Sequence, residues 1–122
     1  MDNYVTDYIK KSEENYKLYE FLAQHNKFES WQVVTIFYSA LCLAKAYLYS
    51  KNIPKNSINS HDCIKGWLAK EKNSRNLNVL YYYENLYRDS RDARYSTKKI
   101  SKERIKKALE NFKEVKQKLI IQ

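Results

Sequence analysis

The chain has 122 residues, with 23 Lys+Arg against 14 Asp+Glu, and 15% of its residues are aromatic. That much aromatic surface exceeds what disordered segments carry, and the length suits one small domain that spans residues 1–122. With only one Gly and one Pro, tight turns are too few for barrels, sandwiches or glycine-rich phosphate-binding folds, so we expect an all-α fold.

Apolar residues recur at three- and four-residue spacing from residue 4 to 24, which predicts a first helix. A second helix over 31–50, with Ser30 as its N-cap, is apolar on nearly all sides. Such a helix belongs in the middle of a bundle, where small residues such as Ser39 allow close contacts. Residues 51–59 contain the proline and several Asn and Ser residues, which predicts a loop.

Three further helices follow this loop. A short one begins after a cap at Ser60 and ends near Lys72, a fourth spans 77–95, and a fifth, capped by Ser101, spans 102–121. The buried positions of the fourth helix are predicted to be Leu77, Leu80, Tyr83, Leu86 and Tyr87. The sequence therefore predicts an up-and-down bundle of four to five helices.

The two cysteines, Cys42 and Cys63, form neither a disulfide framework nor a zinc pattern, which favours a reducing cytoplasm. The first residues show no apolar run after a basic start, and the longest apolar stretch, 33–49, is interrupted by Ser39 and Lys45. We therefore expect neither secretion nor a membrane span.

The two halves of the chain differ in charge. Residues 1–50 carry 5 Lys and 6 acidic residues, a balance of −1, whereas residues 51–122 carry 18 basic and 8 acidic residues, a balance of +10. Within the second half, residues 88–107 hold nine cations against three acidic residues. This concentration favours RNA or DNA as a partner. For residues 98–118, a solvated Lys-rich helix face is the simpler interpretation.

The fourth helix carries two guanidinium groups and a phenol along one strip of surface: Glu84, Arg88, Arg91 and Tyr95, with Arg94 adjacent. Guanidinium binds phosphate bidentately and Tyr stacks on bases, so the strip predicts a contact site for RNA. The predicted RNA- and phosphate-binding residues are Arg88, Arg91, Arg94, Tyr95, Lys98 and Lys99. Alternatively, Glu84–Arg88 and Arg88–Asp92 are ordinary ion pairs that support the helix.

Little in the sequence points to an enzyme. A metal site needs three or four ligands, and His61 with Cys63 offers two at most, so no metal is expected, and no cofactor. The simplest role for His61 is that of a helix-start residue with a local hydrogen bond. The Arg strip lacks a group that exchanges protons near pH 7. If the chain is catalytic, the candidates are Arg88, Arg91 and Tyr95, with His61 and Asp92 as accessory residues.

The order and wording of these segments resemble the HEPN (higher eukaryotes and prokaryotes nucleotide-binding) family. The similar segments are the first helix YIKKSEENYKLYEFLAQHNKFE, the small-residue-rich WQVVTIFYSALCLAKAYLYSKNI, a loop that opens into SHDCIKGWLAK, and a fourth helix that ends in RDSRDARY. The resemblance covers most of the chain. It implies a four- or five-helix bundle that usually dimerises, with the fourth-helix motifs of both subunits facing a shared cleft.

Many HEPN proteins are metal-independent ribonucleases of toxin–antitoxin and phage-defence systems, often encoded beside a minimal nucleotidyltransferase. Their active motif is Arg, four to six residues, then His. This sequence departs from that motif, because Ala93, Arg94 and Tyr95 stand there and no His follows His61. The resemblance places Arg88 or Arg91 at the family's Arg position, Tyr95 near its aromatic position, and Asp89 or Asp92 at a polar position after the Arg.

The sequence thus predicts a non-catalytic HEPN-like module that binds RNA or a nucleotidyltransferase-type partner. One alternative is a metal-independent endoribonuclease toxin, in which Arg88 and Arg91 bind the scissile phosphate and Tyr95 or His61 from across the dimer assists. The other is a structural helical protein whose basic face binds an acidic protein. A homodimer is expected from the resemblance and from the excess of aromatic side chains.

Overall fold

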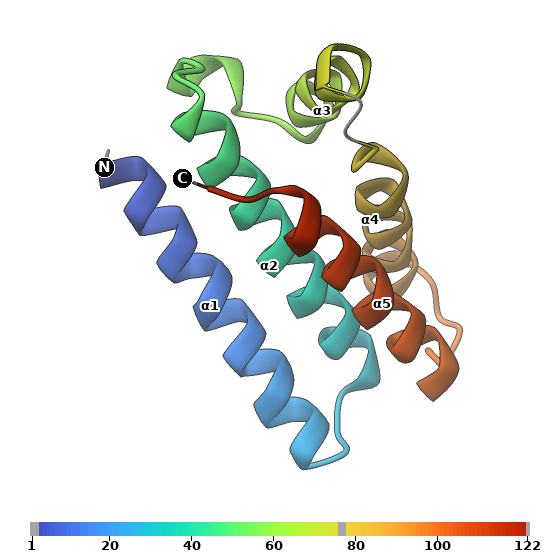
Figure 1. The fold of residues 1–122 in the computed structure, drawn as a ribbon. Helices are drawn as coiled ribbons and strands as arrows, with labels where there is room; N and C mark the ends of the chain where they lie inside the picture. The colour runs from blue at the N-terminus through green and yellow to red at the C-terminus, as the bar shows by residue number, and fades with distance from the viewer. Residues whose placement is uncertain (1–2, 76–77, 122) are drawn as a thin grey trace.

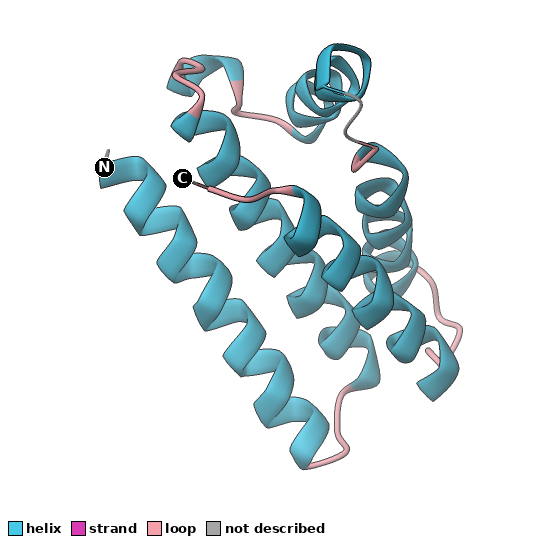
Figure 2. Cartoon of the chain, in the orientation of Figure 1, coloured by secondary structure: helices cyan, strands magenta, loops and turns pink. Residues whose placement is uncertain are grey.

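The computed structural model describes residues 3–75 and 78–121. Within those residues all regular structure is helical, with five α-helices, one short 3-10 helix and no strand (Figures 1 and 2). The elements are α1 (Asn3–Gln24), α2 (Glu29–Ser50), η1 (Lys55–Ser57), α3 (His61–Arg75), α4 (Leu80–Tyr95) and α5 (Lys102–Lys118). The prediction of an all-α bundle is confirmed.

Helix α2 is the centre of the bundle. It packs against α1 on one side and against α4 and α5 on the other, while α3 lies across one end and contacts α2 and α4 less extensively (Figure 1). By length and composition α2 could cross a membrane, but 67% of its most apolar stretch is buried inside the bundle. Such burial is that of a core helix, as its apolar sequence predicts.

The α1–α2 contact depends on small side chains. Ser12 Oγ donates to the Ser39 carbonyl oxygen at 2.8 Å, and Ser39 Oγ donates to the Ser12 carbonyl oxygen at 2.7 Å. Both serines are buried. The two helix backbones can approach closely enough for this exchange because neither position carries a large side chain, which confirms the prediction for Ser39.

Helix α4 buries one face and leaves the other available. Tyr83 and Leu86 are fully buried, and Leu80 and Tyr87 are half-buried against the same core. Leu77, also predicted to be buried, lies outside the described residues. Helix α4 begins at Leu80 rather than at residue 77, and its last turn ends at Tyr95, as predicted.

Two of the predicted caps are confirmed. The backbone N–H of Cys63 donates to Ser60 Oγ at 3.2 Å, and that of Arg104 donates to Ser101 Oγ at 3.1 Å. The cap at Ser30 is wrong, because α2 already begins at Glu29 and the preceding residue provides no side-chain cap.

Two predicted helix ends also differ from the structure. Helix α3 continues past Lys72 to Arg75, so most of the predicted connector is helical. Helix α5 ends at Lys118 instead of residue 121, because Leu119 leaves the helical conformation and is only 2% exposed. Burial of this leucine against the core replaces the last helical turn.

Candidate nucleic-acid interface

A cleft of about 550 Å³ opens between the middle of α2, the start of α3 and the C-terminal half of α4. Its lining residues are Phe37, Tyr38, Leu41 and Lys45 from α2, Asn59 and Ser60 from the loop before α3, His61 and Ile64 from α3, and Tyr87, Arg91, Arg94 and Tyr95 from α4. Helices α2 and α4 run in opposite directions, so the last turns of α4 lie beside the first half of α2 (Figure 1). Segments that are distant in the sequence therefore meet in the cleft.

The cleft is positively charged. Lys45, Arg91 and Arg94 all line it, and among its lining residues in the described chain there is no Asp or Glu. Ion pairs on α4 within the described residues involve Glu84, Asp89 and Asp92, and none involves Arg91 or Arg94. A hollow lined by one sign of charge with apolar walls attracts anions.

Aromatic rings and neutral oxygens, instead of carboxylates, hold the two arginines. Arg94 Nε donates to the Ser90 carbonyl oxygen at 3.3 Å, and its Nη1 donates to Tyr38 Oη at 3.5 Å. The guanidinium carbon of Arg91 lies 5.9 Å from the ring centroids of both Tyr87 and Tyr95. These contacts orient both side chains and leave N–H donors for a bound anion.

Tyr95 forms the exposed rim of the cleft. It is 74% exposed, and its ring centroid lies 5.2 Å from the guanidinium carbon of Arg94. Aromatic side chains are usually at least partly buried, so an exposed tyrosine beside two arginines is a candidate ligand contact. A flat ring beside cations is the arrangement on which nucleic-acid bases stack.

The structure adds His61 to the cleft wall, but its ring nitrogens are engaged or buried. The imidazole stacks on Tyr87 with ring centroids 3.5 Å apart, and Nδ1 lies 3.2 Å from Tyr83 Oη. Nε2 is buried and has no hydrogen-bond partner among the described residues. Burial, together with the Lys65 charge, lowers the pKa of His61, so the ring is neutral at pH 7.

The predicted local hydrogen bond of His61 is wrong, because the partner of its ring is distant in the sequence. Its partner, Tyr83, comes from α4 and lies 22 positions further along the chain. Burial raises the pKa of the Tyr83 phenol, which consequently keeps its proton. The pair joins the start of α3 to the core face of α4.

The predicted strip on α4 is divided. Arg91 and Tyr95 line the cleft, whereas Arg88 lines two neighbouring hollows outside it. Arg91 also borders one of these hollows, together with Glu84 and Asp92. The proposed helix-supporting pairs of Arg88 do not form among the described residues. Lys65 Nζ lies 2.7 Å from Glu84 Oε1, and Asp92 pairs with Arg104.

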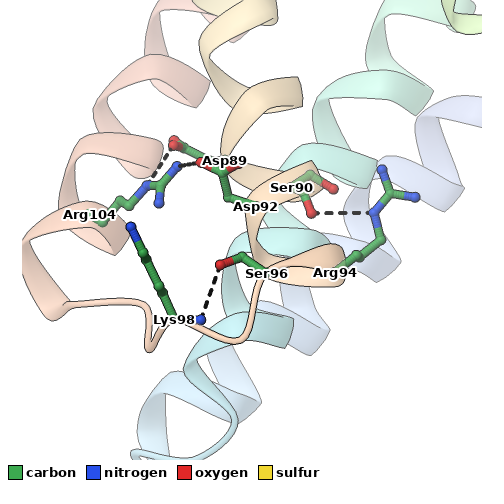
Figure 3. A network of polar contacts seen from close by, with 7 residues as sticks. All are labelled: Asp89, Ser90, Asp92, Arg94, Ser96, Lys98 and Arg104. Carbon is green, nitrogen blue, oxygen red and sulfur yellow. Dashed lines mark hydrogen bonds and ion pairs between the residues drawn. The ribbon is translucent and has the colours of Figure 1, made fainter.

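Arg104 on α5 is neutralised by two carboxylates of α4 (Figure 3). Its Nε donates to Asp89 Oδ1 at 2.9 Å, and its Nη2 donates to Asp92 Oδ2. Burial raises the pKa of Asp89, and the Arg104 charge acts in the opposite direction. The predicted accessory residue Asp92 thus joins α4 to α5 at a place outside the cleft.

Lys98 and Lys99 lie in the segment after α4 and are exposed. The backbone N–H of Lys98 donates to Ser96 Oγ at 3.1 Å (Figure 3), and neither lysine lines the cleft. Sequence reasoning missed Lys45 and Tyr38 as members of the site. A single lysine in an otherwise apolar helix, seven residues after a tyrosine, is the signal that could have found them.

Within the described residues, no three His, Cys, Asp or Glu side chains are grouped to hold a metal ion. A scan against protein-family models, a search of curated proteins and a search of solved structures each found no match to this chain.

Proposed function

We propose that the protein is a HEPN-like helical module that binds single-stranded RNA in the cleft between α2, α3 and α4, without cleaving it. The observation that carries this proposal is the set of three cations, Lys45, Arg91 and Arg94, in a tyrosine-lined cleft whose described lining has no carboxylate. The wider role, in a toxin–antitoxin or phage-defence unit, derives from the sequence resemblance alone.

The chemistry of the cleft matches one segment of a single strand. The guanidinium groups of Arg91 and Arg94 supply donors for a phosphate, and the Tyr95 ring supplies a face for an adjacent base. A volume of about 550 Å³ is that of a small-molecule site. Double-stranded RNA is recognised across a wide groove, so splayed single-stranded nucleotides fit such a cleft better.

A metal-independent endoribonuclease is the second candidate, because the structure places His61 in the same cleft as Arg91. Cleavage needs a group that exchanges protons with the bound RNA. Here Nδ1 is engaged with Tyr83, and Nε2 is shielded from solvent. Because neither ring nitrogen of His61 is open to exchange a proton with bound RNA, the geometry favours binding over cleavage.

The test is to incubate the purified protein with mixed cellular RNA, with and without EDTA, and to measure both retention and cleavage. We expect retention without cutting, and at least a tenfold loss of affinity in the Arg91→Ala/Arg94→Ala variant. The matched control is Lys106→Ala/Lys107→Ala, which removes the same charge from the exposed face of α5 and should change affinity much less.

Three results would contradict the proposal. An equal loss in both variants would mean that total charge alone holds the RNA. EDTA-resistant cutting that disappears in His61→Phe would make the protein a ribonuclease. No retention by the wild type would direct the search to a nucleotidyltransferase-type or acidic protein partner.

A further inference from the structure

The turn that joins α1 to α2 lies at the lower end of α1 in Figure 1. Exposed hydrophobic side chains occur on both sides of this turn. The exposed fractions are 47% for Leu18, 58% for Phe21, 62% for Phe28 and 58% for Trp31. A hollow of about 300 Å³ lies among Leu18, Leu22, Phe28, Trp31 and Thr35. We call the residues Leu18, Phe21, Leu22, Phe28 and Trp31 the hairpin patch.

The backbone of this turn holds Phe28 outward. Phe28 has φ 55° and ψ 56°, a left-handed conformation that bulky residues rarely adopt. The buried Gln32 fixes the turn, because its backbone N–H donates to the Phe28 carbonyl oxygen at 3.0 Å and its Nε2 donates to the Lys27 carbonyl oxygen at 2.9 Å. Asn or Gly would adopt this conformation more easily. Phe28 is both backbone-strained and exposed in the single chain, which indicates that a binding partner covers its ring.

Charge identifies the kind of surface that can approach. The half of the chain that forms the hairpin has a balance of −1, with exposed Lys17, Glu20 and Lys27 of both signs near the patch. The other half has a balance of +10. RNA or an acidic protein is drawn to the basic half, whereas two copies of this cationic chain repel each other least when they meet through the hairpin.

The shape of the patch suits a second copy. It contains both exposed rings, those of Phe28 and Trp31, and a hollow that these rings help to line. A two-fold contact can therefore place a ring of each copy in the hollow of the other. A buried aromatic side chain covers about 150–250 Å². The exposed parts of the patch on two copies thus amount to roughly 800–1,000 Å², near the lower limit for a specific interface.

We propose that two copies of this chain associate through the hairpin patch about a two-fold axis. The cleft that we assign to RNA shares no lining residue with the hollow of the hairpin patch, so this dimer leaves the cleft uncovered. The dimer implied by the family resemblance is different, because there the fourth-helix motifs share one cleft. The two arrangements depend on different side chains and can be separated by mutation.

Sedimentation equilibrium of the full chain, from about 1 to 100 µM, tests the proposal. We expect a concentration-dependent species of twice 14.7 kDa. Phe28→Asn and Trp31→Ser should each raise the dissociation constant at least about tenfold, since aromatic anchors dominate interfaces. The matched control, Tyr81→Ser, removes a ring that is 59% exposed on α4 and should change nothing.

Circular dichroism checks that the variants fold, and Phe28→Asn is chosen because Asn tolerates the left-handed turn. A wild type that stays at 14.7 kDa throughout the range would overturn the proposal and leave the patch for a different protein. A dimer that persists in both patch variants but dissociates in Arg91→Ala would equally overturn it, in favour of an interface at the cleft.

Discussion

The arginines that face the two sides of α4 differ in how their charge is balanced. On the α5 side, Arg104 is hydrogen-bonded to Asp89 and Asp92 (Figure 3). On the α2 side, Arg91 and Arg94 face tyrosine rings and a cleft whose described lining has no carboxylate. Arginine thus occurs with carboxylate partners on α5 and without them on α4.

Arginines paired with carboxylates stabilise the fold, whereas arginines without such partners can bind an anionic ligand. An arginine whose donors already engage carboxylates holds two helices together and has little left for a ligand. An arginine oriented by rings keeps its charge unneutralised, which costs folding little at a partly exposed site and favours an incoming anion. Mutations on the two sides of α4 should therefore affect different properties of the protein.

The largest effect is expected from Arg91→Glu. This change puts a carboxylate into the cleft, where it repels phosphate and neutralises Arg94, so RNA affinity should fall about a hundredfold, or roughly 2.7 kcal/mol. Arg91 has no ion pair among the described residues, so the midpoint of thermal unfolding should barely move. Fluorescence anisotropy with a labelled single strand measures the affinity.

Lys106→Glu is the control for Arg91→Glu, because it makes the same change of charge on an exposed face of α5. We expect a loss of affinity of about threefold or less, from long-range attraction alone. Equal losses in the two variants would show that the cleft is not the site.

Arg104→Ala should have the opposite signature, with lower stability and unchanged RNA affinity. It leaves Asp89, whose side chain is 14% exposed, without its charged partner. Because Arg104 itself is 34% exposed and solvent screens the pair, we expect a loss of about 1–2 kcal/mol in the free energy of unfolding. Urea denaturation measures this loss, and Arg88→Ala, which breaks no ion pair among the described residues, is the matched control.

The helices could be predicted because their signals are local. The spacing of apolar residues located all five, and the hydroxyl caps Ser60 and Ser101 marked two of their starts. The misplaced ends depend on contacts distant in sequence or on unusual backbone geometry. The start of α2 depends on a left-handed Phe28, and the end of α5 depends on the burial of Leu119.

The cleft could be predicted only in part. Helical spacing placed Arg91, Arg94 and Tyr95 near one another, but it could not show that Arg88 lies outside the cleft. That division depends on how α4 is rotated against α2 and α5, which is a property of packing. The contribution of Lys45 on α2, 46 positions before Arg91, likewise appears only when the helices are assembled.

A smaller effect is expected at His61, which lines the cleft from α3. Its protonation should lower the free energy of unfolding as the pH falls. Because burial lowers the pKa of His61 from its ordinary value of 6.5, the unfolded chain binds a proton more readily than the folded one. Its contribution to stability is complete above pH 6.5 and is lost as the pH falls from there through the lower pKa of the folded state. Urea denaturation across this range should show a shallower pH dependence in His61→Phe.

The control for this pH dependence is His25→Asn, which removes the other histidine of the chain, exposed after the end of α1 and outside the cleft. The slope with pH is the quantity to compare, since His61→Phe also removes the contact with Tyr83 Oη and shifts stability at every pH. An identical slope in wild type and His61→Phe would mean that the ring is accessible to solvent, which would reopen the case for its role in cleavage.

The smallest effect is expected from Lys98→Ala/Lys99→Ala. Both lysines are exposed and lie outside the cleft, so they act on RNA through screened long-range attraction, not through direct contact. RNA affinity should fall only about two- to threefold at physiological salt, with a decrease of less than about one in the slope of log affinity against log salt, because no phosphate contact is lost. Titrations at several salt concentrations measure both. A loss as large as that of Arg91→Glu would place the RNA along the segment after α4, and the contrast between balanced and unbalanced arginines would then not explain where RNA binds.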